Sequence, residues 1–317
     1  MAIQIEPIPE KLSAGGFAVI LAGGDGVRLR QMTKRIAGCE LPKQFCQMLG
    51  DECLLTTTRK RIARHFPPEN VFFSLTESHE EFYRPLLDAV PAENKIVQTA
   101  NRGTAAAMLF SLFRLAKIDP EAVAGFFPAD HYVSDDVVFM NHVADAYRAV
   151  ANKPEAVVLV GIEPLTPKSS YGWIEPCPLE TAQFYPGVRK IGRFWEKPTT
   201  REAAQLMKRG GLWNSFVIVG RVKNLIALFR KHLPDLYRLF AVGRLAVGTF
   251  AEHFTMGSIY RMIETHDLSF DVLERCREEL YVLHAGGLSW SSLADPEEVL
   301  LKMAQLGLKN RLFPLAS

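Results

Sequence analysis

The 317-residue sequence predicts an α/β fold, in which a mainly parallel central sheet carries helices on both faces. Short apolar runs recur along the first half of the chain. They lack the strict alternation of polar and apolar residues that marks a strand with one solvated face. Segments with the apolar spacing of helices separate these runs. Strands that alternate with helices in this way are typical of a parallel sheet covered on both sides.

Four runs in the first half are the expected strands. They are FAVILAGG (17–24), NVFFSL (70–75), AVAGFFPAD (122–130) and AVVLVGIEP (156–164). One helix is expected at 104–117, where the residues are apolar all round. Another is expected at 135–150, which begins with acidic residues and follows Ser134, a residue type favoured at helix N-caps.

The second half of the chain is richer in strands and less regular. Strands are expected at 171–176, 188–198, 215–222 and 280–285, and helices at 199–211, 269–279 and 295–307. No internal repeat is present. We therefore predict one elaborated domain over residues 1–285, followed by a small C-terminal helical extension over residues 286–317.

The composition excludes several classes of protein. Hydrophobic residues make up 48% of the chain, and 37 Lys and Arg residues oppose 35 Asp and Glu residues. The net charge of +2 argues against a broad nucleic-acid or membrane surface. The five cysteines form no C-x-x-C pair, and no apolar run approaches the ~20 residues of a membrane span. We expect a cytoplasmic protein with reduced thiols. The sequence does not decide whether the chain is a monomer or a homo-oligomer.

A glycine-rich stretch follows the first expected strand. Gly23, Gly24 and Gly26 lack Cβ atoms, so their backbone N–H groups can approach phosphate oxygens closely. Residues 21–50 also hold five basic and two acidic side chains, which predicts an electropositive phosphate site. The stretch lacks the Gly-Lys of a Walker loop, and Leu29 replaces the third glycine of a dinucleotide fingerprint. A tight strand-to-helix turn with solvated basic residues is the structural alternative.

Asp130 ends the apolar run at 122–130, so its carboxylate is expected at the carboxyl edge of a buried strand. Mg²⁺ prefers a few carboxylates together with phosphate oxygens and water. One or two aspartates therefore suffice when a substrate completes the coordination, and Asp130 is the candidate Mg²⁺ ligand. A turn or a helix cap is the alternative for an aspartate in this position.

Ordered motifs along nearly the whole chain resemble those of the sugar nucleotidyltransferases, and most closely those of the mannose-1-phosphate guanylyltransferases. They are LAGGDGVRL (21–29), PKQF (42–45), NRGTAAA (101–107), FPADHYVSDD (127–136), GIEPLTPKSSYGWIEP (161–176), FWEKPTTREAA (194–204) and LWNSF (212–216). The resemblance implies a Rossmann-like, glycosyltransferase-A-like nucleotidyltransferase fold. It also implies attack of a sugar-1-phosphate, here mannose-1-phosphate, on the α-phosphorus of a nucleoside triphosphate, here GTP, with release of pyrophosphate.

The resemblance also assigns roles to particular residues. The nucleotide-binding residues that it implies are Leu21, Ala22, Gly23, Gly24, Gly26, Asn101 and Thr104. Arg28 would clamp the departing pyrophosphate, Lys43 would place a charge near the reacting phosphates, and Asp130 would hold Mg²⁺. For Asn101 and Thr104 helix capping is the alternative, because both stand near the start of an expected helix.

Four further residues are implied to bind the sugar. They are Gly172, Glu196, Lys197 and Asn214. A glycine permits close approach of a pyranose ring, and the acid and the amide can bond hydroxyl groups. Lys197 can meet the phosphate of the sugar. A solvated charge pair is the alternative for Glu196 and Lys197.

Two departures from the family pattern bear on function. The family usually carries Trp-Ser-Asp near the C-terminus with a metal-binding aspartate, and this chain has Trp290, Ser291 and Ser292. Phe216 stands where glycine is usual and adds bulk beside the expected sugar pocket. Two hypotheses follow. One is an active, Mg²⁺-dependent enzyme for mannose-1-phosphate or another hexose or heptose phosphate. The other is a noncatalytic relative that binds a nucleotide sugar and regulates a partner.

Overall fold

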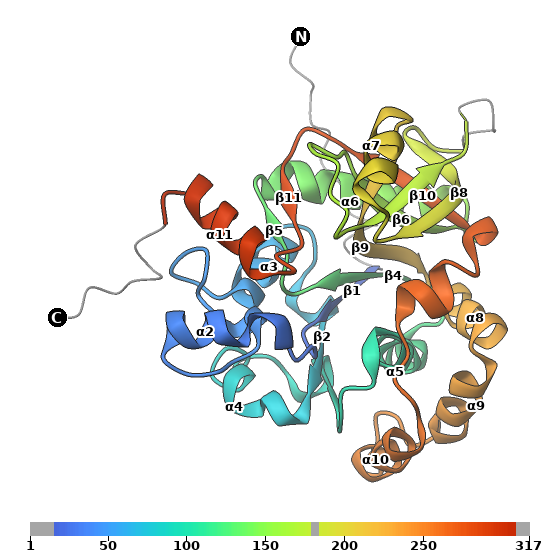
Figure 1. Ribbon diagram of the computed structural model, residues 1–317. Helices are drawn as coiled ribbons and strands as arrows, with labels where there is room; N and C mark the ends of the chain where they lie inside the picture. The colour runs from blue at the N-terminus through green and yellow to red at the C-terminus, as the bar shows by residue number, and fades with distance from the viewer. Residues whose placement is uncertain (1–15, 179–183, 309–317) are drawn as a thin grey trace.

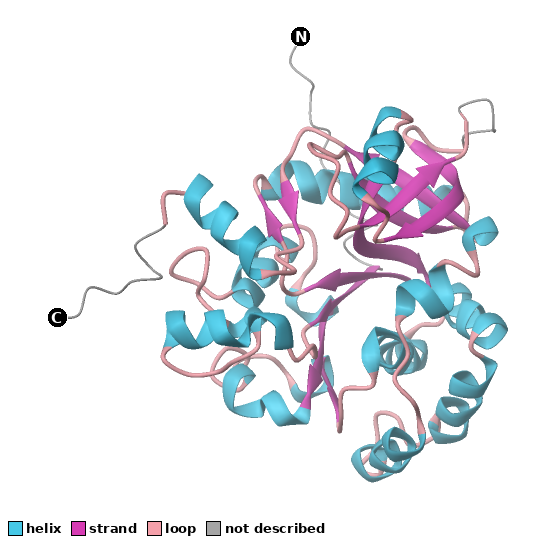
Figure 2. Cartoon of the chain, in the orientation of Figure 1, coloured by secondary structure: helices cyan, strands magenta, loops and turns pink. Residues whose placement is uncertain are grey.

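A nine-stranded sheet forms the centre of the computed structural model, which describes residues 16–178 and 184–308 (Figures 1 and 2). In order across the sheet the strands are β3 (Lys95–Gln98), β2 (Val71–Thr76), β1 (Gly16–Leu21), β4 (Val123–Pro128), β9 (Leu212–Arg221), β6 (Val157–Ile162), β10 (Leu280–Ala285), β8 (Val188–Glu196) and β7 (Gly172–Pro176). Strand β7 also pairs with β9. The strands expected from the sequence are all present.

The direction of the strands divides the sheet. Strands β3, β2, β1 and β4 are parallel, as the buried runs of the first half predict, and β6 pairs in parallel with β10. Strand β9 is antiparallel to β4 and β6, and β8 is antiparallel to β10 and β7. The α/β class is confirmed, but the sheet is mixed. Its parallel part is the one that carries the glycine-rich stretch.

Helices cover both faces of the sheet (Figure 1). The first hydrophobic cluster includes side chains from α3 (Leu54–Ile62), α6 (Asp136–Asn152), α7 (Thr200–Lys208) and α11 (Pro296–Gln305), and α2 (Arg30–Ala37) and α4 (Glu80–Tyr83) also contribute to it. The second includes α5 (Gly103–Ile118), α8 (Val222–His232), α9 (Pro234–Gly243) and α10 (Glu252–Met262). In β1, Ile20 packs in the first cluster and Val19 in the second, which explains why the run does not alternate.

Two helices differ in detail from expectation. Helix α6 is capped by Asp135, whose Oδ1 accepts hydrogen bonds from the N–H groups of Val137 and Val138, and not by Ser134. The Ser134 hydroxyl instead accepts from the N–H of Ser289, a partner that local sequence does not reveal. The helix expected at 269–279 is a π-helix over Ser269–Leu273 with a separate 3₁₀ turn over Arg277–Glu279.

The C-terminal segment packs closely on the rest of the chain. Strand β11 (Trp290–Ser291) pairs with β5 (Tyr132–Val133), and Val299 and Met303 of α11 are fully buried in the first hydrophobic cluster. The helix expected at 295–307 is thus present. The domain boundary at residue 285 stays a prediction, and residues 309–317 lie outside the described part.

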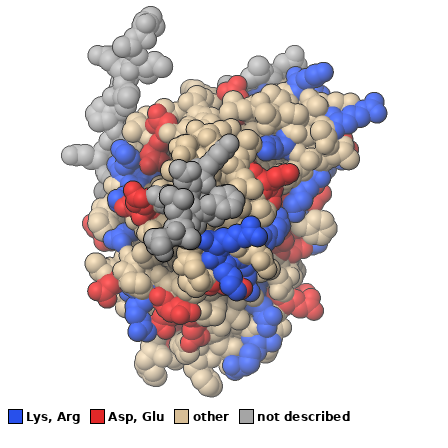
Figure 3. Space-filling view, turned by 60° about the vertical axis from the view of Figure 1, so that its left-hand side comes forward, with Lys and Arg blue, Asp and Glu red and all other residues tan. Residues whose placement is uncertain are grey.

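Charged side chains of both signs are interspersed on the face drawn in Figure 3, in keeping with the small net charge. Cys46, Cys53 and Cys276 are buried, as expected of small apolar residues, and burial raises the pKa of the Cys46 and Cys276 thiols to about 12. No helix in residues 16–178 and 184–308 is long and apolar enough to cross a bilayer.

Candidate active site

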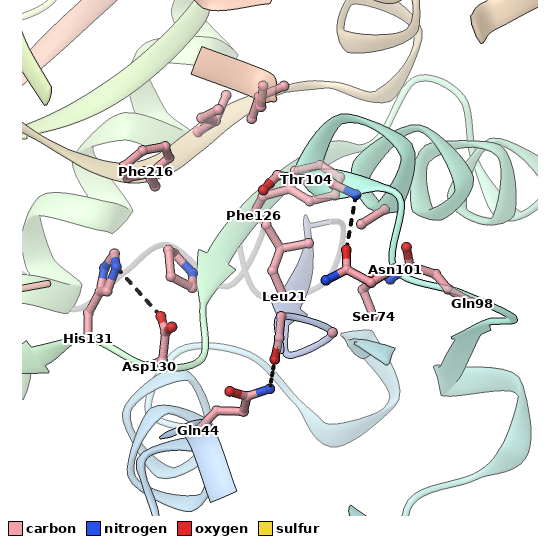
Figure 4. A pocket seen from close by; sticks show the side chains of 17 residues that line it. Leu21, Gln44, Ser74, Gln98, Asn101, Thr104, Phe126, Asp130, His131 and Phe216 are labelled. Atoms are coloured by element: carbon pink, nitrogen blue, oxygen red, sulfur yellow. Dashed lines mark hydrogen bonds and ion pairs between the residues drawn. The ribbon is translucent and has the colours of Figure 1, made fainter. Parts of the chain in front are cut away.

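A cavity of about 330 Å³ lies at the carboxyl ends of β1 and β4 (Figure 4). Six residues that the sequence nominated line it, namely Leu21, Gly23, Gly24, Asn101, Thr104 and Asp130. Its wall also contains residues that sequence reasoning did not nominate, namely Gln44, Ser74, Gln98, Gly103, Ala107, Phe126, Pro128, His131, Phe216, Ile218 and Leu268. The structure therefore brings five of the seven nominated nucleotide residues and the candidate metal ligand into one hollow, whereas Ala22 and Gly26 are not among its lining residues.

The three glycines of the loop after β1 differ in the space around them and in their backbone conformation. A Cβ on Gly23 would lie 2.7 Å from Thr76 Oγ1, and a Cβ on Gly26 would lie 2.9 Å from the backbone N of Lys43. Gly26 also has a φ of +59°, which glycine adopts without strain. Around Gly24 nothing lies within 4 Å of an added Cβ. Close packing thus requires Gly23 and Gly26, whereas the open side of Gly24 leaves room for a ligand.

Gln44 holds this loop in shape. Its buried Nε2 donates to the carbonyl oxygens of Ala22 at 2.9 Å and Gly24 at 2.7 Å. Asp25 of the same loop accepts from Asn101 Nδ2 at 2.9 Å and lies 3.1 Å from His79 Nε2. These positioning contacts were missed from the sequence, although the PKQF motif contains Gln44.

The side chain of Asn101 is hydrogen-bonded to other residues of the protein. Its Oδ1 accepts from the N–H of Gly103 at 3.0 Å, at the start of α5, so the amide has protein partners on both sides. Asn101 thus makes a local hydrogen bond, but the N-cap of α5 is Arg102 and no side chain caps the helix, so the capping alternative is not confirmed. Contact of Asn101 and Thr104 with a nucleotide stays a prediction.

Lys43 links the cavity to the C-terminal segment. Its Nζ donates to the carbonyl oxygens of Ser292 at 2.8 Å and Leu293 at 3.1 Å, and it lies 3.1 Å from Asp130 Oδ2. An ammonium group has three donors, and each of these acceptors can take one. The side chain is only 9% exposed, so Lys43 is a fixed charge beside the cavity.

Asp130 is ionised at neutral pH. Burial by itself raises the pKa of its carboxyl, but the charge of Lys43 and the contact with it outweigh this, and the pKa lies below its usual value. The neighbouring His131 has its pKa lowered to about 4 by burial, so its ring is neutral. That ring packs against Trp290 with a centroid distance of 5.0 Å.

The donor set fits Mg²⁺ only if a substrate supplies most of the ligands. Asp130 offers one partly exposed carboxylate, and within the described ranges no group of three or more His, Cys, Asp or Glu side chains is placed to hold a metal. Ser292 does not extend the set, because its Oγ donates to Glu298 Oε2 at 3.3 Å. Mg²⁺ commonly binds one or two carboxylates plus phosphate oxygens, so one aspartate is compatible with it.

The nominated sugar residues form a second cluster, at the ends of β7, β8 and β9. Gly172 pairs with Glu196 across the sheet, and a Cβ on Gly172 would lie 3.1 Å from Glu196 Oε2 and 3.8 Å from Asn214 Nδ2. Asn214 is 1% exposed and its Nδ2 has no partner. Burial raises the pKa of Glu196, against the opposing effect of Lys197 at 3.5 Å. A buried donor without a partner, beside a bare glycine and a carboxylate, is suited to a hydroxylated ligand.

Arg28 stands apart from both groups. Its side chain is exposed on the turn before α2, and it is not among the residues that line the cavity. Clamping of pyrophosphate by Arg28 stays a prediction. Of the five basic side chains in residues 21–50, Lys43 is the buried one beside the cavity.

Residues 17–237 match the protein family described as Nucleotidyl transferase, which is well over half of the chain. The chain belongs to the nucleotidyl transferase family. The membership confirms the resemblance read from the ordered motifs.

Two relatives are similar to this chain over most of its length. The alginate biosynthesis protein AlgA of Pseudomonas putida is 26% identical over 88% of this chain and 58% of its own length. Mannose-1-phosphate guanylyltransferase 2 of Escherichia coli O157:H7 is 30% identical over 70% of this chain and 46% of its own length. This chain thus spans about half the length of these relatives.

Solved structures share the nucleotidyl transferase fold. A structure from Thermus thermophilus, described as a mannose-1-phosphate geranyltransferase, has a TM-score of 0.73 at 26% identity and covers 88% of this chain and 76% of its own. A UDP-glucose pyrophosphorylase solved with UDP-glucose has a TM-score of 0.54 at 16% identity, over 93% of this chain and 99% of its own, and supports the fold alone. The expected glycosyltransferase-A-like architecture is confirmed.

Proposed function

We propose that this chain catalyses nucleotidyl transfer from a nucleoside triphosphate, GTP, to a sugar-1-phosphate, mannose-1-phosphate, giving a nucleotide sugar and pyrophosphate. The observation that carries the proposal is the cavity in which Asp130, paired with the buried Lys43, faces the glycine loop. The name of the relative in Escherichia coli O157:H7, a mannose-1-phosphate guanylyltransferase, favours mannose-1-phosphate as the acceptor.

In the proposed reaction, a phosphate oxygen of the sugar-1-phosphate attacks the α-phosphorus, and the bond to the departing pyrophosphate breaks. Both reactants are anions, so the site must offset their repulsion and align them. The open backbone at Gly24 would receive phosphate oxygens, and Lys43 would supply a fixed positive charge. Mg²⁺ held by Asp130 would neutralise further phosphate charge. Arg28, on the exposed turn, would clamp the departing pyrophosphate.

On the acceptor side, Asn214 and Glu196 have complementary chemistry. The unpartnered Nδ2 of Asn214 would donate to a sugar hydroxyl, and Glu196 would accept from one. Gly172 allows Glu196 and Asn214 to pack close to the backbone, where a Cβ would lie 3.1 Å from Glu196 Oε2. Lys197, which is more exposed, would meet the phosphate of the sugar.

A pyrophosphate-release screen tests the proposal. The common nucleoside triphosphates are each combined with mannose-1-phosphate, other hexose 1-phosphates and a heptose 1-phosphate, with and without Mg²⁺. We expect release with GTP and mannose-1-phosphate, in the presence of Mg²⁺. Release with another pair would replace the substrates named here, and no release with any pair would contradict the enzymatic function.

Substitution of Asp130 tests the metal. Asp130→Asn keeps the shape of the side chain but removes its charge, so we expect Mg²⁺-dependent turnover to be lost while the far-ultraviolet circular dichroism is retained. Asp88→Asn, at an exposed position, is the matched control. Turnover by Asp130→Asn with an unchanged Mg²⁺ dependence would assign the ion to another residue.

A second candidate function is noncatalytic binding of a nucleotide sugar by a regulatory homologue. It is favoured by one observation, that Ser292 replaces a carboxylate and is bonded to Glu298. The discriminating result is binding of a nucleotide sugar by calorimetry together with the absence of pyrophosphate release in the full screen.

A further inference from the structure

Buried polar side chains form the end of the cavity that lies away from Asp130. Gln98, the last residue of β3, is 2% exposed, Ser74 of β2 is fully buried, and both line the cavity. In Figure 4 these two residues lie on the side of Asn101, across from Asp130 and His131. Because water does not surround them, their hydrogen bonds must be satisfied within the protein.

The amide of Gln98 has one orientation that suits its neighbours. Its Nε2 donates to Ser74 Oγ and to the carbonyl oxygen of Leu75, both at 3.3 Å. A carbonyl oxygen can only accept, so the reverse orientation would place Oε1 against it with no proton between the two oxygens. With Nε2 on the side of Leu75, the buried Oε1 needs a donor from another part of the chain.

Tyr260 of α10 supplies that donor. Its hydroxyl donates to Gln98 Oε1 at 3.1 Å, and its buried ring packs against Phe110 and Phe240. Burial raises the pKa of the hydroxyl well above its usual value, so the hydroxyl keeps its proton. The carbonyl oxygen of Tyr260 accepts from Arg102 Nε at 2.9 Å. Helix α10 is therefore bonded to both ends of the segment 98–102.

The amide of Gln98 also borders the glycine loop. A Cβ on Gly23 would lie 2.8 Å from Gln98 Nε2, and Thr76 Oγ1, at 2.7 Å from the same position, donates to the Gly23 carbonyl at 2.9 Å. The N–H of Ala22 donates to the Ser74 carbonyl at 2.8 Å. Gly23 thus occupies a slot lined by the Gln98 amide and the Thr76 hydroxyl, and a rotation of the amide would change the space in that slot.

We propose that Tyr260 is a positioning residue for nucleotide binding, whose hydroxyl fixes the Gln98 amide against Gly23 and so holds the glycine loop in the form that receives phosphate. The proposal rests on the proposed function, in which this cavity binds the nucleotide. Asp130 and the Lys43 ammonium beside it are held by separate contacts. Loss of the Tyr260 hydroxyl should therefore weaken nucleotide binding more than it slows the reaction of bound substrates.

Tyr260→Phe tests the proposal, because it removes the hydroxyl and keeps the ring. We expect the calorimetric Kd of GTP without acceptor, and the KM of GTP, to rise by about 3- to 10-fold, with kcat changed by less than about 2-fold. Tyr147→Phe is the matched control, since its buried hydroxyl donates to the Phe17 carbonyl at the other end of β1. An unchanged Kd in Tyr260→Phe, or an equal rise in both variants, would overturn the proposal.

A double-mutant cycle tests whether the effect passes through Gln98. Gln98→Met keeps the length of the side chain and removes the amide. We expect Tyr260→Phe to raise the Kd of GTP in the wild-type background and to leave it unchanged in the Gln98→Met background. Additive effects would show that Tyr260 acts by another route and would overturn the proposal.

Hydrogen exchange of the ligand-free protein distinguishes this proposal from the proposed function. The N–H of Ala22, at the start of the glycine loop, is the reporter. We expect it to exchange faster in Tyr260→Phe than in Tyr147→Phe, because only the first variant loosens the loop. Equal exchange in the two variants would overturn the role of Tyr260, whether or not GTP binds. If the wild type bound no GTP while Ala22 still responded to Tyr260→Phe, the proposed function would fail and the positioning of the loop by Tyr260 would stand.

Discussion

Lys43 connects parts of the chain that are distant in sequence. Its ammonium group lies beside Asp130 and is bonded to two carbonyl oxygens about 250 residues further along. These contacts fix the position of the charge before any ligand binds. A fixed charge of this kind stabilises a transition state without reorganisation during the reaction.

Lys43→Ala should therefore lower kcat by about 10² to 10³, the effect of losing one preorganised electrostatic group. Steady-state pyrophosphate release provides the measurement. Lys34→Ala, which removes an exposed lysine of the same segment, is the control. Equal turnover of Lys43→Ala and Lys34→Ala would remove Lys43 from the catalytic site.

His131 should make folding stability depend on pH. Its pKa of about 4 in the folded chain lies below ~6.5 in the unfolded chain, so the unfolded state binds the proton more strongly. The contribution is complete above pH 6.5 and is lost as the pH falls toward 4. His131→Gln should remove up to about 2 kcal/mol of the stability difference between pH 7 and pH 5.

Urea unfolding at the two pH values measures this contribution of His131. His253→Gln, at an exposed position, is the control and should keep the wild-type dependence on pH. The same dependence in His131→Gln would show that His131 is accessible to protons in the folded chain.

At the scale of elements, the turn between β11 and α11 organises the carbonyl groups that hold Lys43. Glu298 of α11 is buried, and its carboxylate accepts from the hydroxyls of Ser291 at 2.9 Å and Ser292 at 3.3 Å and from the N–H of Ala294 at 2.9 Å. Burial raises the pKa of Glu298. A second carboxylate at this turn would therefore lie close to Glu298, whose ionised form is already disfavoured by burial.

Ser292→Asp should destabilise the fold by about 1–3 kcal/mol, because the new carboxylate lies against Glu298. Mg²⁺ should recover part of that loss in the variant and have a smaller effect on the wild type, since two carboxylates bind the ion better than one. Thermal unfolding with and without Mg²⁺ measures both effects. Ser292→Asp combined with Glu298→Gln should regain stability without Mg²⁺, and an equal Mg²⁺ response in all three proteins would exclude a metal site at this turn.

The elements that could be predicted from the sequence are those whose signals are local. The apolar run at 17–24 predicts β1 because both faces of that strand are buried, and the run at 280–285 coincides with β10. The sequence predicts the N-cap of α6 one residue early, because Ser134 and Asp135 are both residue types favoured as caps. In the structure the hydroxyl of Ser134 accepts a hydrogen bond from the N–H of Ser289, and Asp135 caps the helix. The local pattern does not contain that contact.

In the candidate site, too, features with a local sequence signal could be predicted and features that depend on tertiary contacts could not. Gly23, Gly24 and Asp130 follow directly from strand ends, and the structure brings them together in one cavity. The tie between Lys43 and Ser292 depends on tertiary packing, so no spacing in the sequence reveals it. Phe216 was noted as bulk, whereas its positive φ arises from a bulge that only strand register shows.

At the scale of the whole molecule, the cavity, which is lined mainly by residues of the first half of the chain, also depends on residues after position 285. Trp290 packs against His131, and the carbonyls of the following turn hold Lys43. Helix α11 fastens this segment to the first hydrophobic cluster through Val299 and Met303. The segment after residue 285 therefore contributes to the site.

The pair Val299→Ala and Met303→Ala tests this dependence. Truncating two fully buried side chains should cost about 3 kcal/mol or more, and loosening α11 should lower kcat as well, because the carbonyls that position Lys43 lose their support. Leu300→Ala with Leu301→Ala shortens two neighbouring exposed side chains of the same helix and should change both quantities little. Urea unfolding and pyrophosphate release measure the two pairs side by side. A lower stability with an unchanged kcat in the buried pair would contradict this dependence. The residues after 285 would then stabilise the fold without contributing to the reaction.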